Sequence, residues 1–160
     1  MILYHGSDIS VPHPDVLHSK GNLDFGTGFY TTSNEAQAQR WARRKAFFSG
    51  KSKGVVNSYE VKEASSLSVL DFGEDLDSWI DFVCACRNGE QIFRQYDVIS
   101  GKVADDTVFR VVGLYLNGVW EKERAIREMR AYETYNQTAF ISQRAIDELL
   151  SFQGSYEVTL

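Results

Sequence analysis

The sequence predicts an α+β protein, because predicted strands and helices are mixed along the chain without the regular strand–helix–strand alternation of a doubly wound parallel sheet. The 160 residues are enough to bury a sizeable core, and no internal repeat or linker-like segment divides them. A hydrophobic share of 43% is ordinary for a globular protein. We therefore expect residues 1–160 to form a single domain.

Strands are predicted where β-branched and alternating residues lie between turn signals. The predicted strands cover residues 2–4, 29–32, 55–61, 67–72, 97–100, 138–141 and 156–160. Residues 8–28 are polar and rich in turn-forming residues, so they are predicted to form a long ordered loop.

Helices are predicted where apolar residues recur three and four positions apart. The first is expected to begin at Asn34, which has the spacing of a capping box with Gln37, and to end at Gly50. Its predicted buried face carries Ala38, Trp41, Ala42 and Lys45. Further helices are predicted over residues 77–87, 105–116 and 119–131, and over a segment that begins at Ser142 and carries Ile146, Leu149 and Leu150.

Three residues on these helices have structural interpretations. Cys86 falls on the apolar face of the helix over 77–87, where a small core residue is expected. Asp105 and Asp106 stand at the start of the next helix, so capping and a favourable helix-dipole interaction are preferred over a catalytic role.

Net charge limits the partners. A formal charge of −5 argues against binding of duplex nucleic acid through a broad basic face. The longest basic cluster is Arg40, Arg43, Arg44 and Lys45, and it is interpreted as the solvated end of a helix.

Cysteine and histidine usage limits the chemistry and the compartment. Cys84 and Cys86 are too close to join distant parts of the fold, which excludes a disulfide framework. His5, His13 and His18 match no zinc-ligand spacing, so no metal is expected. No signal peptide or apolar stretch of membrane-spanning length is visible, and a cytoplasmic location is therefore expected.

Three short motifs stand in a fixed order along the chain. The first is Tyr4-His5-Gly6-Ser7, directly after the opening strand. The second runs from Phe25 through Gly26, Thr27, Gly28 and Phe29 to Tyr30, and Trp41 follows Tyr30 by eleven residues. The third is Tyr135-Asn136-Gln137 at the start of a late strand.

This ordered set resembles the ADP-ribosyltransferase superfamily, in particular its poly(ADP-ribose) polymerase-like, diphtheria-toxin-like branch. The whole chain, including residues 96–106, also looks like a small bacterial family of that superfamily whose members often stand beside antitoxin-like partner genes. The resemblance implies a fold of split antiparallel sheets with flanking helices, and NAD as the substrate.

The resemblance also implies roles for single residues. His5 would hydrogen-bond a ribose hydroxyl of NAD, and Gly6, followed by Ser7, would offer its backbone N–H and C=O to the nicotinamide carboxamide. Tyr30 and Trp41 would stack on opposite sides of nicotinamide, an interaction of about 1 kcal/mol beyond area burial. Gly28 would form a wall of the pocket as well as a turn.

Each of these residues also has a structural interpretation. His5 could be a buried histidine satisfied by backbone groups, although its position next to Gly6 favours function. Gly28 could be a turn glycine alone, and Tyr30 fits core and cleft equally on its pattern. Trp41 by itself is better explained by core packing on its helix.

The chain departs from the superfamily pattern at two positions. Gln137 stands where the catalytic glutamate is expected, and an amide can hydrogen-bond a hydroxyl but cannot accept its proton. Polymer elongation is therefore not expected, and Glu133 is an alternative base. Ala38 replaces a serine that would contact the carboxamide.

The sequence therefore predicts an NAD-dependent mono-ADP-ribosyltransferase with His5, Tyr30 and Gln137 as catalytic residues. It would act as a bacterial toxin on a macromolecule, with protein preferred to nucleic acid because of the acidic composition, and an antitoxin protein would be its partner. The alternatives are a noncatalytic module that binds NAD or ADP-ribose and an NAD glycohydrolase that uses water as acceptor.

Overall fold

The structure is a computed structural model that describes residues 1–19, 23–63 and 66–160. Residues 20–22 of the predicted loop over 8–28 lie outside the described residues. The strands are β1 (Ile2–Ser7), β2 (Phe29–Thr31), β3 (Lys53–Val61), β4 (Val69–Asp71), β5 (Val98–Lys102), β6 (Asn136–Phe140) and β7 (Leu150–Thr159). The helices are α1 (Glu35–Phe48), α2 (Leu76–Arg87), the 3₁₀ turn η1 (Ile92–Gln95), α3 (Asp106–Leu116), α4 (Lys122–Arg130) and α5 (Gln143–Leu149).

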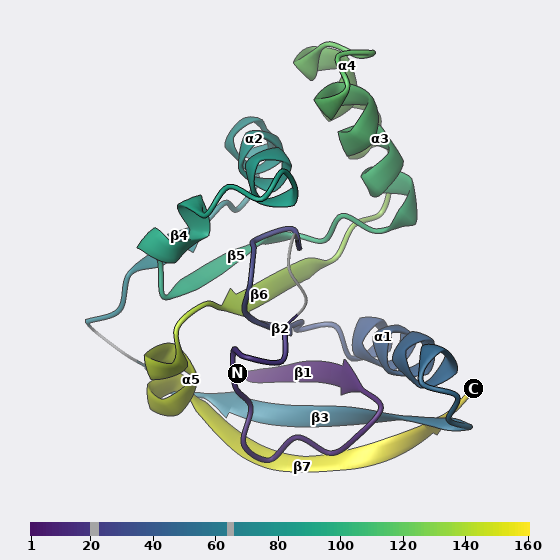
Figure 1. The fold of residues 1–160 in the computed structure, drawn as a ribbon, viewed down its shortest axis with the longest axis vertical. Helices are drawn as coiled ribbons and strands as arrows, with labels where there is room; N and C mark the ends of the chain where they lie inside the picture. The colour runs from purple at the N-terminus through teal and green to yellow at the C-terminus, as the bar shows by residue number, and fades with distance from the viewer. Residues whose placement is uncertain (20–22, 64–65) are drawn as a thin grey trace.

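The strands form two sheets, which confirms the α+β class (Figure 1). One sheet has the antiparallel order β1-β3-β7. The other has the order β2-β6-β5-β4, in which only β4 and β5 run parallel. A β-bridge between Tyr4 and Thr32 joins β1 to the chain just beyond β2. The opening strand of one sheet therefore lies next to an edge of the other.

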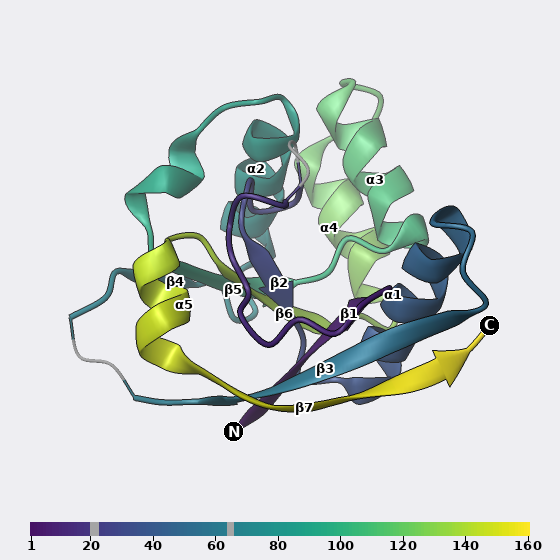
Figure 2. The same ribbon diagram turned by 60° about the horizontal axis from the view of Figure 1, so that its bottom comes forward.

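Helices and the second sheet divide the core into layers. The side chains of α2, α3 and α4 pack on one face of β5 and β6 around the buried Trp79. On the other side lie β1, β3 and β7, and Phe29, Tyr59 and Phe140 fill the space between the two sheets. Figure 2 shows this division, with the three helices on one side of β5 and β6 and the β1-β3-β7 sheet on the other.

Helix α1 packs tightly on the first sheet because small residues face each other. Ala38, Ala42 and Ala46 are fully buried along one side of the helix. A Cβ atom on Gly6 would lie 2.2 Å from the Ala38 carbonyl oxygen, and one on Gly54 would lie 2.5 Å from the Ala42 carbonyl. Only glycine permits this contact between strand and helix. Trp41 is half-buried and Lys45 is exposed, whereas Ala46 is buried. The buried face of the helix therefore differs by about one residue from the predicted one.

Most elements lie where the sequence predicts them, but their ends differ. Asn34 accepts a hydrogen bond from the Gln37 N–H at 3.0 Å, whereas the Gln37 side chain binds Arg40 and does not complete the capping box. The helix predicted over 119–131 begins at Lys122. The last strand begins at Leu150, six residues before its predicted start, because pairing with β3 extends it through polar residues.

Candidate functional site

The three motif segments lie on neighbouring strands. Tyr4 and Thr32 exchange two backbone hydrogen bonds of 2.8 and 2.9 Å, which join β1 to the end of β2. Strand β2 then pairs with β6, where Tyr30 stands opposite Ala139 and Thr31 opposite Thr138. Segments that are more than a hundred residues apart in sequence are thereby held side by side.

His5 is held in a single tautomer by the second motif. Its Nδ1 lies 2.6 Å from the Tyr30 carbonyl oxygen, and a carbonyl can only accept, so Nδ1 carries the proton. Burial lowers the pKa of His5 to about 4, the hydrogen bond to Tyr30 opposes this shift, and the positive charge of Lys45 adds to it. The imidazole is therefore neutral near pH 7, with Nε2 as an acceptor. No donor among the described residues contacts Nε2.

Gly6 is a buried residue of β1 whose backbone groups point away from β3. Successive residues of a strand point their N–H and C=O groups in opposite directions. Tyr4 points both groups away from β3 toward Thr32, so Gly6, two residues later, points its own groups the same way. The Trp41 side chain begins beside this position, with its Cβ 2.8 Å from where a Gly6 Cβ would be. One donor and one acceptor thus lie near the start of the Trp41 side chain.

The Tyr30 phenol lies on the other face of β2 from His5. Phe29, whose ring centroid is 4.3 Å from that of His5, faces the space between the sheets, whereas Tyr30 packs with the core on the helix side. The phenol donates to the Gly26 carbonyl at 2.6 Å and accepts from the Phe25 N–H at 2.9 Å. Burial raises the pKa of Tyr30 well above its usual value. His5 therefore contacts the backbone of Tyr30 and not its phenol.

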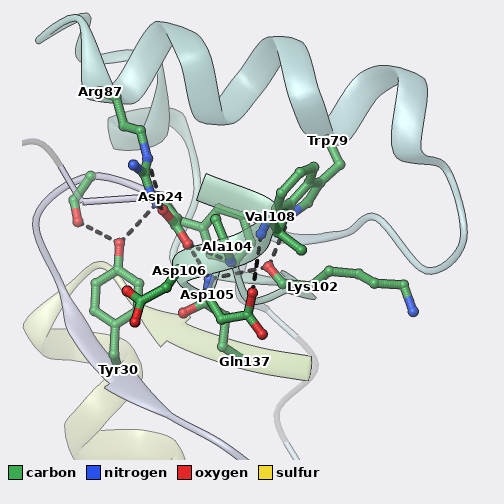
Figure 3. A network of polar contacts seen from close by, with 12 residues as sticks. Asp24, Tyr30, Trp79, Arg87, Lys102, Ala104, Asp105, Asp106, Val108 and Gln137 are labelled. Carbon is green, nitrogen blue, oxygen red and sulfur yellow. Dashed lines mark hydrogen bonds and ion pairs between the residues drawn. The ribbon is translucent and has the colours of Figure 1, made fainter. Parts of the chain in front are cut away.

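Gln137 belongs to a buried polar network centred on Asp24 (Figure 3). Its Nε2 donates to Asp24 Oδ2 at 3.0 Å and to the Lys102 carbonyl at 3.2 Å. The Ala104 N–H also donates to Oδ2 at 3.0 Å. Arg87 donates to Asp24 Oδ1 from Nε at 3.0 Å and from a second nitrogen. Four donors therefore converge on one carboxylate.

This network fixes the orientation of the Gln137 amide. Both hydrogens of Nε2 are used, so the amide cannot flip without placing its carbonyl oxygen against two acceptors. Among the described residues no donor contacts Oε1, yet no fully enclosed side-chain oxygen or nitrogen lacks a partner. Oε1 is therefore not fully enclosed and can accept a further hydrogen bond, although the residue as a whole is only 4% exposed.

The other predicted NAD-binding residues have structural contacts as well. The Ser7 hydroxyl, 3% exposed as a residue, accepts from the Ile9 N–H at 3.4 Å and helps to turn the chain after β1. The Gly28 N–H donates to the Ser19 hydroxyl at 3.1 Å. A Cβ on Gly28 would lie 2.8 Å from the Phe140 carbonyl oxygen, so the glycine permits close pairing of β2 with β6.

The acidic residues near the third motif are explained by local structure. Asp105 is the N-cap of α3 and accepts from the Val108 N–H at 3.1 Å, which confirms the capping prediction. Asp106 lies in the first turn and pairs with Arg44 at 3.7 Å. Glu133 is exposed in the loop before β6. Ala38 is fully buried against Gly6.

Two cavities formed by described residues lie elsewhere. One of about 130 Å³ is lined by Lys102, Leu76, Met129 and Arg130 among others. Another lies beside Arg87 and Phe109 on α3. Neither is lined by a predicted NAD-binding residue, so the predicted site corresponds to a strand edge and not to one of these cavities. No group of three or more potential metal ligands occurs within residues 1–19, 23–63 and 66–160.

Sequence reasoning missed Asp24 and Arg87. Asp24 directly precedes the Phe-Gly-x-Gly turn, and its position next to that motif was the one available signal. Arg87 stands in the last turn of α2, where a cation is expected in any case. Nothing in the local pattern indicates that its guanidinium reaches a residue 63 positions earlier.

Comparisons with known proteins identify the family alone. The sequence model of a family described as a protein of unknown function, DUF3990, matches residues 1–152. Neither the comparison with curated proteins nor that with solved structures gave a match. No helix in the described part of the chain has the length and apolar content needed to cross a membrane.

Proposed function

Because the chain belongs to the DUF3990 family, whose function is unknown, we propose its activity from its own residues: an NAD-dependent mono-ADP-ribosyltransferase that modifies a macromolecule and releases nicotinamide. In this proposal the two sheets are the split sheets of the ADP-ribosyltransferase fold. The protein would act as a toxin in a bacterial cytoplasm and would be neutralised by a partner antitoxin.

The edge of β1 carries the proposal. A primary carboxamide such as that of nicotinamide needs one acceptor for its N–H and one donor for its oxygen. Gly6 offers both groups on the side of β1 that faces away from β3, and Trp41 begins beside them. Next to them His5 Nε2 is a neutral acceptor for a hydroxyl, in a tautomer set by Tyr30. These groups fit the nicotinamide–ribose half of NAD.

The proposed residues act by holding NAD in one pose. Gly6 binds the carboxamide, the Trp41 indole stacks on the pyridinium, and His5 Nε2 accepts from a ribose hydroxyl. Stacking on a cation weakens when neutral nicotinamide leaves, so Trp41 contributes to binding more than to the chemical step. Gln137 Oε1 accepts a second hydroxyl hydrogen bond, with its orientation fixed by Asp24.

One observation favours a second function, a noncatalytic module that binds NAD or ADP-ribose. The carboxylate nearest to Gln137 is Asp24, which accepts four hydrogen bonds and pairs with Arg87. A carboxylate engaged in this way is a poor base for an incoming nucleophile. Transfer would then require an acceptor that is already a good nucleophile.

The experiment is incubation of the pure protein with NAD labelled in the adenylate, with and without bacterial extract. We expect label on a macromolecule and nicotinamide release that depends on the extract. Binding of NAD without turnover would support the binding module, and nicotinamide release without extract would support an NAD glycohydrolase. Absence of binding to both NAD and ADP-ribose would refute all three.

Two variants locate the site within the same assay. His5→Ala removes the Nε2 acceptor and is expected to weaken NAD binding at least tenfold, since a lost hydrogen bond to a buried partner costs about 1–3 kcal/mol. His13→Ala is the matched control, because His13 is exposed and has no part in the proposed site. Equal loss in both variants would show that the assigned edge is wrong.

A further inference from the structure

Charge is distributed unevenly along the chain. Residues 36–59 contain six of the 17 Lys and Arg residues and none of the 22 Asp and Glu residues. The remaining residues hold 11 basic and 22 acidic side chains, so a basic segment belongs to an otherwise strongly acidic protein. Four of the six cations are on α1 and two are on the loop and strand that follow it.

Two phenylalanines are exposed within this basic segment. Phe47 is 69% exposed and Phe48 is 74% exposed, at the C-terminal end of α1. Their ring centroids are 5.6 Å apart with an edge-to-face geometry, and the Arg44 guanidinium lies 5.9 Å from the Phe48 centroid. The two rings form one exposed apolar patch, and exposed apolar patches are found at interaction sites.

These side chains form a row along the outer side of α1. The buried side carries Ala38, Ala42 and Ala46. Arg40, Arg44 and Phe48 follow one another at intervals of four residues, which places them one above the other on a helix. At 1.5 Å per residue, the row from position 40 to 48 is about 12 Å long. That length corresponds to about three stacked nucleotides at 3.4 Å each.

The row leads toward the candidate site. At its N-terminal end the Arg40 guanidinium lies 4.8 Å from the Tyr135 ring centroid, and Tyr135 directly precedes Asn136 and Gln137. Arg44 lies 3.7 Å from Asp106, an exposed carboxylate that a phosphate could replace as its partner. Lys45, also exposed, is one residue further along the helix.

We propose that this surface, Arg40, Arg44, Phe47 and Phe48 of α1, binds single-stranded nucleic acid. Guanidinium groups fit phosphates, and exposed aromatic rings stack on unpaired bases, which is how strand-binding proteins combine charge with stacking. A paired duplex has no free base faces for Phe47 and Phe48. The proposal that this surface binds single strands depends only on the positions and charges of these side chains. The further idea that it delivers an acceptor to Gln137 rests on the proposed function.

The test measures binding of the full-length protein to fluorescent 12-nucleotide oligomers by anisotropy, in the absence of NAD. The probes are a single-stranded RNA, a DNA of the same sequence, and the corresponding duplex. We expect one or both single strands to bind at least tenfold more tightly than the duplex. The RNA and DNA arms identify the sugar that is preferred.

Variants separate stacking from charge. Phe47→Ser with Phe48→Ser is expected to weaken single-strand binding at least tenfold. Arg40→Gln with Arg44→Gln is expected to weaken it and to reduce the slope of log affinity against log salt by about 1.4, since each lost phosphate contact removes about 0.7. Arg124→Gln with Arg127→Gln is the matched control pair for charge, because both arginines are exposed on α4 and Arg124 also lies over an aromatic ring, 4.2 Å from the centroid of Trp120.

Several results would overturn the proposal: no binding by the wild type, equal binding of duplex, equal loss in the control pair, or displacement by poly-glutamate as efficient as by RNA. The last result would assign the surface to an acidic protein. Failure of this inference is distinct from failure of the proposed function. If NAD is turned over and the oligomers do not bind, only the surface is refuted, whereas bound oligomers without NAD binding refute only the transferase.

Discussion

At the scale of single residues, the hydrogen-bond partners of Gln137 decide its properties. The sequence alone shows an amide at the position where the resemblance to ADP-ribosyltransferases predicts a glutamate. The structure adds that the amide nitrogen is aimed at Asp24 and at the Lys102 carbonyl, 3.0 and 3.2 Å away. Glutamine is thus the residue that this network requires, because a carboxylate would meet two acceptors with no proton to share.

Gln137→Glu is therefore expected to lower the free energy of unfolding by about 3 kcal/mol and not to raise NAD turnover, since it buries a second carboxylate beside Asp24. Urea denaturation at pH 7.5 measures the change. Adding Asp24→Asn should restore part of the lost stability, because the two positions then share one negative charge. A stable Gln137→Glu protein with increased turnover would contradict this account of the network.

His5 gives a prediction about pH. Its pKa is about 4 in the folded protein and 6.5 in the unfolded chain, so the unfolded chain binds the proton first as pH falls. The stability contributed by neutral His5 is complete above pH 6.5 and is lost between about 6.5 and 4, to a maximum of about 3 kcal/mol.

His5→Gln should remove this dependence, because glutamine can still donate to the Tyr30 carbonyl but does not titrate. We expect wild type to lose about 2 to 3 kcal/mol more than the variant between pH 7.5 and pH 4.5, measured by urea denaturation at both values. Parallel stability curves for the two proteins would show that His5 is not held neutral by the fold.

At the scale of elements, the contact between α1 and β1 shapes the candidate site. The helix approaches the strand so closely that its backbone atoms fill the space where a Gly6 side chain would be. This approach brings the start of the Trp41 side chain to the edge of β1. The sequence predicts the helix and the strand separately. Only the packed structure shows that the row of alanines on α1 permits the close approach to Gly6.

Gly6→Ala is expected to lower the free energy of unfolding by about 2 kcal/mol or more and to abolish NAD binding, because the new Cβ would lie 2.2 Å from backbone of α1. Gly113→Ala is the control. Gly113 is inside α3 and has no atom within 4 Å of a Cβ position, so alanine should stabilise the protein by about 1 kcal/mol. Chemical denaturation of both variants checks the difference in sign.

At the scale of the whole molecule, the Asp24 network connects three segments that are far apart in the sequence. Asp24 lies just before the second motif, Arg87 at the end of α2, and Gln137 at the start of β6. The Arg87 guanidinium also lies 4.1 Å from the Phe109 ring centroid on α3. The ion pair thus connects the N-terminal loop to the helical layer and to the central strands.

Arg87→Met is expected to lower the free energy of unfolding by about 3 to 5 kcal/mol, because the Asp24 and Arg87 side chains are only 10% and 17% exposed and the carboxylate would lose its counter-charge. Arg144→Met is the matched control, since Arg144 and Glu148 form an ion pair with 56% and 41% exposed side chains. That change should cost less than about 1 kcal/mol. Similar losses in both variants would contradict a central role for Asp24.

The sequence by itself determined the α+β class, the order of the helices and strands, and the caps at Asn34, Asp105 and Ser142. These features depend on neighbours within a few residues, where hydrogen-bond and apolar spacings are visible in the chain. Tertiary structure alone decided the early start of β7, the exposure of Phe47 and Phe48, and the convergence of Asp24, Arg87 and Gln137. Each of these depends on how distant parts of the chain pack together, and no local pattern shows which distant group will cover a side chain, satisfy a buried charge or extend a strand.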